Sequence, residues 1–233
     1  MNVHRKLLIP ALVAVALGVA VAATAEAAAG PAKSYGPTLT SPVSPTLQTG
    51  PDGFIKGWFL LEPIPVFGLS RSEVQAMVKK EYFPGQNTVI PHDGEAETVD
   101  SKTLTWHAVD TRLYNVNLFH FSRALHVSST NALFWVVTTV DSPREMHNVR
   151  LAIGSNAASV WWLNGQEVIG IYRDRQTVID DGVSQRITLK KGPNVVRAAV
   201  VNAGGATDFC ARFLDANEKP IAGLTVDLHG PRP

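Results

Sequence analysis

The sequence predicts an all-β protein, an antiparallel sandwich or barrel with one short helix near residues 70–81. Three observations favour this class: short alternating or β-branched runs recur from residue 98 onward, turn residues separate them, and Asn164-Gly165 lies between two apolar runs. Asn-Gly between apolar runs is the strongest short-range signal for a hairpin, because both turn residues need a positive φ. Closely spaced strands with little helix are typical of an antiparallel sandwich or barrel.

Prolines and a helix-capping pattern predict the first strand and the helix. Residues 54–61 read as a strand that the prolines after it stop. Ser70 and Glu73 form a capping-box pattern, and apolar residues follow at helical spacing. We therefore expect a helix of about three turns over residues 70–81, and it is the single helix that the pattern beyond the first 51 residues supports.

The remaining segments read as strands, since they alternate or are rich in β-branched residues and end at turn residues. These strands are expected at residues 103–109, 116–120, 131–140, 149–153, 159–163, 167–171, 183–189, 195–202, 208–214 and 224–228.

The N-terminus has the layout of a secretory signal. Residues 1–6 are basic, residues 7–23 are almost entirely apolar, and small residues with Ala-x-Ala sites follow. The alternative is a retained membrane anchor, but an apolar run of about 17 residues is at the short limit for crossing a bilayer. We expect residues 1–27 to be a signal peptide and the protein to be periplasmic or extracellular, with no membrane span in the mature chain.

The chain after the signal divides by composition. Residues 28–51 hold five prolines among Gly, Ser and Thr, which is typical of a linker. Residues 52–233 are expected to form the β-sandwich domain. Its one cysteine, Cys210, excludes an intrachain disulfide and lies in an apolar run, so a buried, inert thiol is expected.

The order of motifs in the second half resembles a known class of domain. Residues 162–168, 183–189 and 191–196, followed by Phe209 and residues 212–215, are similar to the galactose-binding-like jelly-roll domains. Such domains are attached to family 2 glycoside hydrolases and to bacterial polysaccharide esterases. The resemblance extends over about residues 54–228 and implies a jelly-roll β-sandwich with a capacity for sugar binding. Relatives often carry acidic residues in the loop before the hairpin, where this chain has residues 154–158 without any.

Charge and chemistry exclude several classes of function. The formal net charge of +1, with no basic cluster, argues against nucleic acid as a partner. No Gly-x-Ser-x-Gly motif is present. The histidines at 107, 120 and 126 lack metal-ligand spacing. Asp180-Asp181 before Gly reads as a turn rather than a hydrolytic carboxylate pair. We predict no catalytic residue, no metal site and no cofactor.

Aromatic and charged residues beside the hairpin are the candidates for ligand binding. Sugars stack on aromatic rings, and their hydroxyl groups form hydrogen bonds with polar side chains. Trp161 and Trp162 point to opposite faces of their strand. The candidate site residues are Trp161, Tyr172, Arg173, Asp174 and Arg175.

The sequence thus favours a non-catalytic binding module for a polysaccharide or glycan. One alternative is that the outward tryptophan packs beneath the helix while the charges form surface pairs. The alternative function is a structural or assembly subunit that docks another exported or envelope protein.

Overall fold

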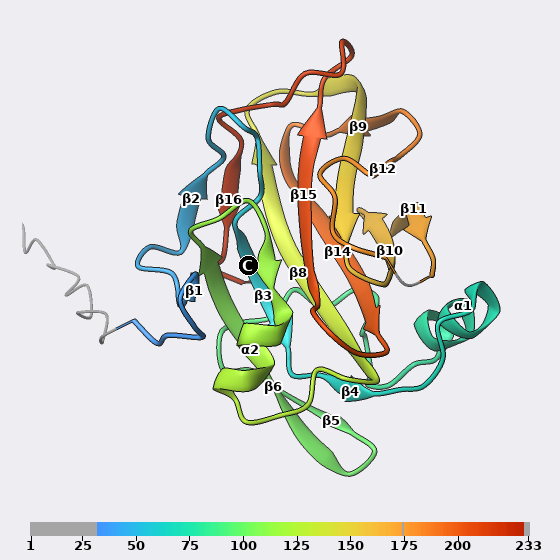
Figure 1. Cartoon of the computed structure of the whole chain (residues 1–233). Coiled ribbons are helices and arrows are strands. Elements are labelled where there is room, and N and C mark those ends of the chain that lie inside the picture. Colours follow the sequence, from blue (N-terminus) through green and yellow to red (C-terminus); the bar gives the residue numbers. More distant parts are fainter. Residues whose placement is uncertain (1–31, 174, 231–233) are drawn as a thin grey trace, which may run out of the picture. The chain divides into compact units, whose positions relative to one another are not determined.

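The computed structural model describes residues 32–230 except residue 174, so the expected signal peptide and Asp174 lie outside the described residues. Two antiparallel sheets pack face to face in the described part of the chain (Figure 1). The all-β sandwich is therefore confirmed. No helix among these residues is long and apolar enough to cross a membrane.

The larger sheet has its main strands in the order β1-β6-β3-β8-β14-β10-β11. It contains β1 (Leu39–Thr40), β2 (Thr46–Gln48), β3 (Gly57–Leu61), β4 (Ile64–Pro65), β5 (Ala96–Val99), β6 (Lys102–Thr111), β8 (Ala132–Ser142), β10 (Ala158–Leu163), β11 (Gln166–Ile171), β14 (Gly192–Asn202) and β16 (Thr225–Asp227).

The smaller sheet has the order β12-β9-β15-β7, with β13 paired to β9. Its strands are β7 (Val116–Asn117), β9 (Met146–Ser155), β12 (Gly182–Val183), β13 (Ile187–Leu189) and β15 (Asp208–Leu214). The strand expected at 183–189 is thus interrupted between β12 and β13.

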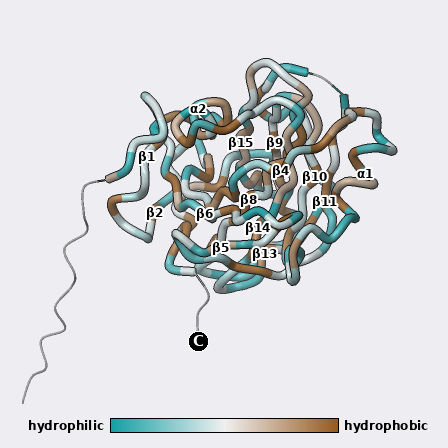
Figure 2. The backbone as a smooth tube through the Cα atoms, turned by 90° about the horizontal axis from the view of Figure 1, so that it is seen from below, coloured by the Kyte–Doolittle hydropathy of each residue, from teal (hydrophilic) through white to brown (hydrophobic). Residues whose placement is uncertain are grey.

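An aromatic cluster joins the two sheets. Trp58 on β3 and Trp161 on β10 meet edge to face with 6.0 Å between ring centroids, and Phe209 of β15 packs against both at 5.2 and 5.6 Å. All three side chains are fully buried. Edge-to-face packing of this kind adds stability beyond the apolar area it buries. Figure 2 shows the apolar strands running through the interior.

The Asn164-Gly165 hairpin between β10 and β11 is confirmed. Both turn residues have positive φ, 51° and 82°. The turn is also held from outside, because the Asn164 amide donates to Oδ1 of the fully buried Asn194 at 3.0 Å. The backbone amide of Val195 donates in return to Asn164 Oδ1 at 2.9 Å.

The helix α1 (Arg71–Lys79) forms where the capping pattern predicts it. The Glu73 amide donates to Ser70 Oγ, and the Glu73 carboxylate accepts from the Ser70 amide at 2.9 Å. Val74 and Val78 are buried. The helix lies beside β10 and β11 in both Figure 1 and Figure 2.

The predictions for residues 116–120 and for the linker are wrong. Residues 116–120 are not a strand: β7 ends at Asn117, which caps α2 (Leu118–Ala124) by accepting a hydrogen bond from the His120 amide at 2.7 Å. The second error concerns the linker. Its described residues contain β1, which pairs with β6, and β2, which pairs with β16. Tyr35 and Leu39 are buried, so this proline-rich segment belongs to the folded body.

Candidate functional site

A groove of about 430 Å³ lies between α1 and the β10–β11 hairpin, and we refer to it as the α1 groove. This volume is within the range of about 300–1,000 Å³ that is usual for small-ligand sites. The groove combines aromatic, amide and charged side chains, among them Gln75, Lys79, Asn87, Trp162, Glu167 and Tyr172.

Strand register brings the sheet side of the groove together. Trp162 on β10 is paired with Arg197 on β14 and with Glu167 on β11. Residues paired across antiparallel strands point to the same face of the sheet. All three side chains line the α1 groove, on the face of the sheet opposite to Trp161.

Trp162 rests on a rigid base. Its ring lies 5.7 Å from that of Trp135, with 31° between the planes, and Trp135 is fully buried. Trp162 itself is partly exposed. A ring supported in this way offers a flat surface to a ligand without first losing rotational freedom.

Arg197 is a buried cation in this groove. Its side chain is 4% exposed, and its Nη2 donates to the Val89 carbonyl at 2.6 Å. Within the described residues its Nη1 has no hydrogen-bond partner. Burial lowers the pKa of Arg197 to about 10, so the guanidinium is still protonated at neutral pH.

Tyr172 is fixed against neighbours on two elements. The ring lies over Gly170, where any Cβ would come within 2.7 Å of the Tyr172 hydroxyl. The Arg71 guanidinium of α1 lies 4.8 Å from the ring centroid, which is a cation–π contact. Tyr172 is therefore held in place as part of the groove wall.

Of the five predicted site residues, Tyr172 alone lines this groove in the described structure. Trp161 is fully buried, and its Nε1 donates to Ser159 Oγ at 2.8 Å. It therefore belongs to the core, and its assignment to the site is wrong. The outward tryptophan is Trp162, which lines the α1 groove together with residues of the helix.

The charged residues after Tyr172 have separate places. Arg173 is exposed, with a φ of 88°. Arg175 forms an ion pair with Asp181, and Asp174 lies outside the described residues. Asp180 forms an ion pair with Arg212, in a turn as expected. The two aspartates are therefore engaged by arginines rather than by each other.

The segment around Val178 covers the outer face of the smaller sheet. A Cβ at Gly154 would collide with the Val178 carbonyl. Thr177 Oγ1 donates to the Asp208 carboxylate, which also accepts from the Asn115 amide. These contacts hold the segment against the smaller sheet.

The titratable groups of the described residues outside the groove have structural surroundings. No cluster of three His, Cys, Asp or Glu that could hold a metal is found among residues 32–173 and 175–230. His107 instead lies between the Tyr35 hydroxyl and the Glu62 carboxylate, at 3.1 Å from each. Cys210 is buried as expected, and desolvation is the main cause that raises its pKa to about 12.

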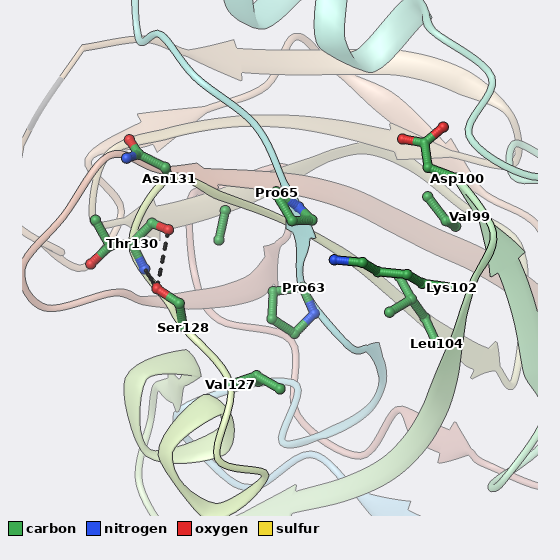
Figure 3. Close-up of a pocket in the computed structure, with 11 residues that line it drawn as sticks. Pro63, Pro65, Val99, Asp100, Lys102, Leu104, Val127, Ser128, Thr130 and Asn131 are labelled. Carbon is green, nitrogen blue, oxygen red and sulfur yellow. Dashed lines mark hydrogen bonds between the residues drawn. The ribbon is translucent and has the colours of Figure 1, made fainter.

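A second pocket, of about 520 Å³, is lined mainly by prolines and aliphatic side chains (Figure 3). Lys102 of β6 extends toward Pro63 and Pro65 in this view, whereas Asp100 points away. The Ser128 hydroxyl is engaged with the backbone of Thr130. Since it has no aromatic ring on which a sugar could stack, this pocket fits a sugar less well than the α1 groove does.

The residues that sequence analysis missed are Trp162, Arg197 and the helix residues facing them. One signal was available. Arg197 is the single charged residue in the apolar run of residues 195–201. A charged side chain is rarely buried in such a run unless it has an ion-pair partner or a functional role.

No protein-family model matches the sequence, and no curated protein matches it. Solved structures give distant likenesses. A PA14 sugar-binding domain from an RTX adhesin is 12% identical with a TM-score of 0.42, over 73% of this chain and 96% of that one. The PA14 domain of the MpAFP antifreeze protein is 10% identical with a TM-score of 0.42, over 77% and 94%. A β-glucosidase from Kluyveromyces marxianus is 18% identical with a TM-score of 0.37, over 70% and 17%. These values are too low to assign the chain to a family.

Proposed function

We propose that this protein is an exported, non-catalytic carbohydrate-binding module whose site is the α1 groove. The observation that carries the proposal is the partly exposed Trp162 ring, held on the buried Trp135 inside a groove of ligand size. Pyranose rings present apolar C–H faces, and a fixed indole is the surface on which such faces stack. Export is supported by the signal-like sequence of residues 1–27.

Polar groups around Trp162 suit a sugar. Gln75 and Asn87 supply amides that can both donate and accept, and Lys79 and Glu167 add a donor and an acceptor at the exposed rim. A few polar groups that converge on an aromatic surface are typical of sites that orient small ligands.

Binding without hydrolysis is favoured by the carboxylates of the groove. Glycosidases of the usual kind need two carboxyl groups on either side of the bond that is cleaved. Glu167 is the one carboxylate among the described residues that line the groove. We therefore propose that the protein holds its glycan and does not cleave it.

We also propose that the sandwich is a galactose-binding-like jelly roll. The motif order that resembles those domains falls on β10, β11, β13, β14 and β15. These strands belong to a single sandwich of two antiparallel sheets.

A glycan array with the purified protein tests the proposed function. We expect binding to at least one polysaccharide class, weakened at least about tenfold by Trp162→Ala, the effect of losing one well-packed aromatic contact. Phe67→Ala is the matched control, since Phe67 is 76% exposed and does not line the groove. Binding to no glycan, or equal binding by the wild type and Trp162→Ala, would overturn the proposal.

One observation favours the alternative of a docking subunit. Two segments of the chain carry exposed apolar side chains, Leu113 and Tyr114 in one and Val178 and Ile179 in the other. The Asp208 carboxylate links these segments, because it accepts hydrogen bonds from Asn115 and Thr177. An exposed apolar patch can mark a protein interface. A photocrosslinker at Val178 tests this in envelope extracts. A single defined adduct that Tyr114→Asp abolishes would support docking, whereas an absence of adducts would count against it.

A further inference from the structure

We propose that the α1 groove selects acidic sugars and that the Arg197 guanidinium binds the anionic group of the ligand. The inference rests on the proposed function and specifies the class of glycan. The shared chemistry is an oxyanion on a sugar ring, either the carboxylate of a uronic acid or a sulfate ester.

The first step is the missing counter-charge of Arg197. Its side chain is 4% exposed, yet no acidic side chain within the described residues forms an ion pair with it. The one hydrogen-bond partner of its side chain among these residues is the neutral Val89 carbonyl. Burying an unpaired charge costs several kcal/mol in general, so a buried arginine without a carboxylate is unusual.

Other arginines of the fold show the ordinary solution. Arg212 also projects from the middle of a strand, but it forms a two-pronged contact with Asp180. Arg175 has Asp181, and Arg150 has Glu218. Arg197 is the exception among these buried or half-buried arginines, and it is the one that lines the groove.

The second step is the unused donor. Nη1 of Arg197 is buried and has no hydrogen-bond partner in the described part of the chain. A guanidinium matches a planar carboxylate with two parallel hydrogen bonds. An anion that enters the groove would therefore satisfy a donor that the protein itself leaves unsatisfied.

The third step is the position of Arg197 beside Trp162. The two residues are register partners on neighbouring strands. Side chains paired in this way start about 5 Å apart. In a uronic acid the carboxylate is attached directly to the pyranose ring, so a ring stacked on Trp162 can turn its carboxylate toward Arg197.

Charges around the groove agree with this selection. Lys79 and Arg71 are cationic and Glu167 is anionic, and all three side chains are exposed, whereas Arg197 is buried. Solvent screens an exposed charge far more than a buried one. Glu167 therefore opposes an acidic sugar weakly, and it is free to accept hydrogen bonds from sugar hydroxyls.

Calorimetric titration with matched ligands tests the proposal. The probes are galacturonate oligosaccharides and their methyl esters, and sulfated glycan oligosaccharides with their desulfated forms. The charged member of at least one pair should bind about 10- to 100-fold more tightly, as expected for hydrogen bonds to a charged group.

Variants assign the selectivity to Arg197. Arg197→Gln should lower the affinity for the charged ligand to that for the neutral one, and Arg197→Lys should retain part of the preference. Arg144→Gln is the matched control, because Arg144 is exposed and lies in the turn between β8 and β9, outside the groove. Thermal unfolding of each variant shows that it is folded.

The outcomes separate the two proposals. Equal affinity within both pairs, with a loss in Trp162→Ala, would leave carbohydrate binding intact and overturn the selection of acidic sugars. A preference that Arg197→Gln retains would also overturn it. Binding to no glycan of any kind would overturn both.

Discussion

Trp162 and Arg197 face each other across β10 and β14 on the outer face of the larger sheet. The pair places an aromatic surface and a buried cation in the same groove. Trp161, the next residue along β10, points to the opposite face and completes the aromatic core with Trp58 and Phe209. Of the two adjacent tryptophans, Trp161 therefore stabilises the core and Trp162 forms part of the candidate site.

Trp161→Ala should lower the free energy of unfolding by about 3–5 kcal/mol, the usual cost of removing a buried Trp or Phe from a core. Trp162→Ala should cost clearly less, because its side chain is partly exposed. Urea denaturation of both variants measures the difference. Equal losses would contradict the assignment of the two residues to different faces.

Arg197→Met should leave the protein at least as stable as the wild type at neutral pH. Burial lowers the pKa of Arg197 from its ordinary value to about 10, so folding opposes the charged form, and wild-type stability rises as the pH increases above about 10. The variant lacks the buried charge and should also lack this increase. Thermal unfolding across that pH range checks both points; a marked loss of stability at pH 7 would show that Arg197 supports the fold.

Gly154→Ala should destabilise the protein by about 1–3 kcal/mol, as overpacking does in a dense interior. The new methyl group would collide with the Val178 carbonyl and displace the segment above the smaller sheet. Gly204→Ala is the control, because its Cβ would meet Thr130 at an ordinary 3.7 Å. Urea denaturation of the two variants should separate them, and similar small losses would argue against tight closure at Gly154.

Cys210 should resist alkylation by iodoacetamide until the protein unfolds. The thiol is buried, and desolvation raises its pKa from 9.0 to about 12, so almost no thiolate exists at pH 8. The same shift lowers stability as pH rises from 9 toward 12, because the unfolded thiol ionises first. Mass spectrometry of native and urea-treated protein measures the labelling; rapid labelling of the native form would contradict this burial.

Strand patterns predicted most of the sandwich because β-branched and aromatic runs stop at clear turn residues. The α1 capping box and the Asn164-Gly165 turn were predictable for the same reason, since each depends on residues close in sequence. The strand expected at 116–120 failed because the side chain of Asn117 accepts from the His120 amide and starts a helix. Local hydrogen bonding of this kind overrides β-propensity.

The choice between Trp161 and Trp162 could not be made from alternation. The smaller sheet covers the inner face of β10, and α1 lies near its outer face. Nearly every residue of the strand is therefore buried. Alternation indicates orientation only where one face is exposed to solvent. The linker was misread for a related reason: Tyr35 and Leu39 bury themselves against strands that are distant in sequence.

The pairing of β2 with β16 affects how the chain can be made. Thr46 and Asp227 are register partners, and β16 lies between β2 and β8. This part of the sheet cannot be completed until β16 has emerged from the ribosome, and a contact between segments so far apart in sequence slows folding.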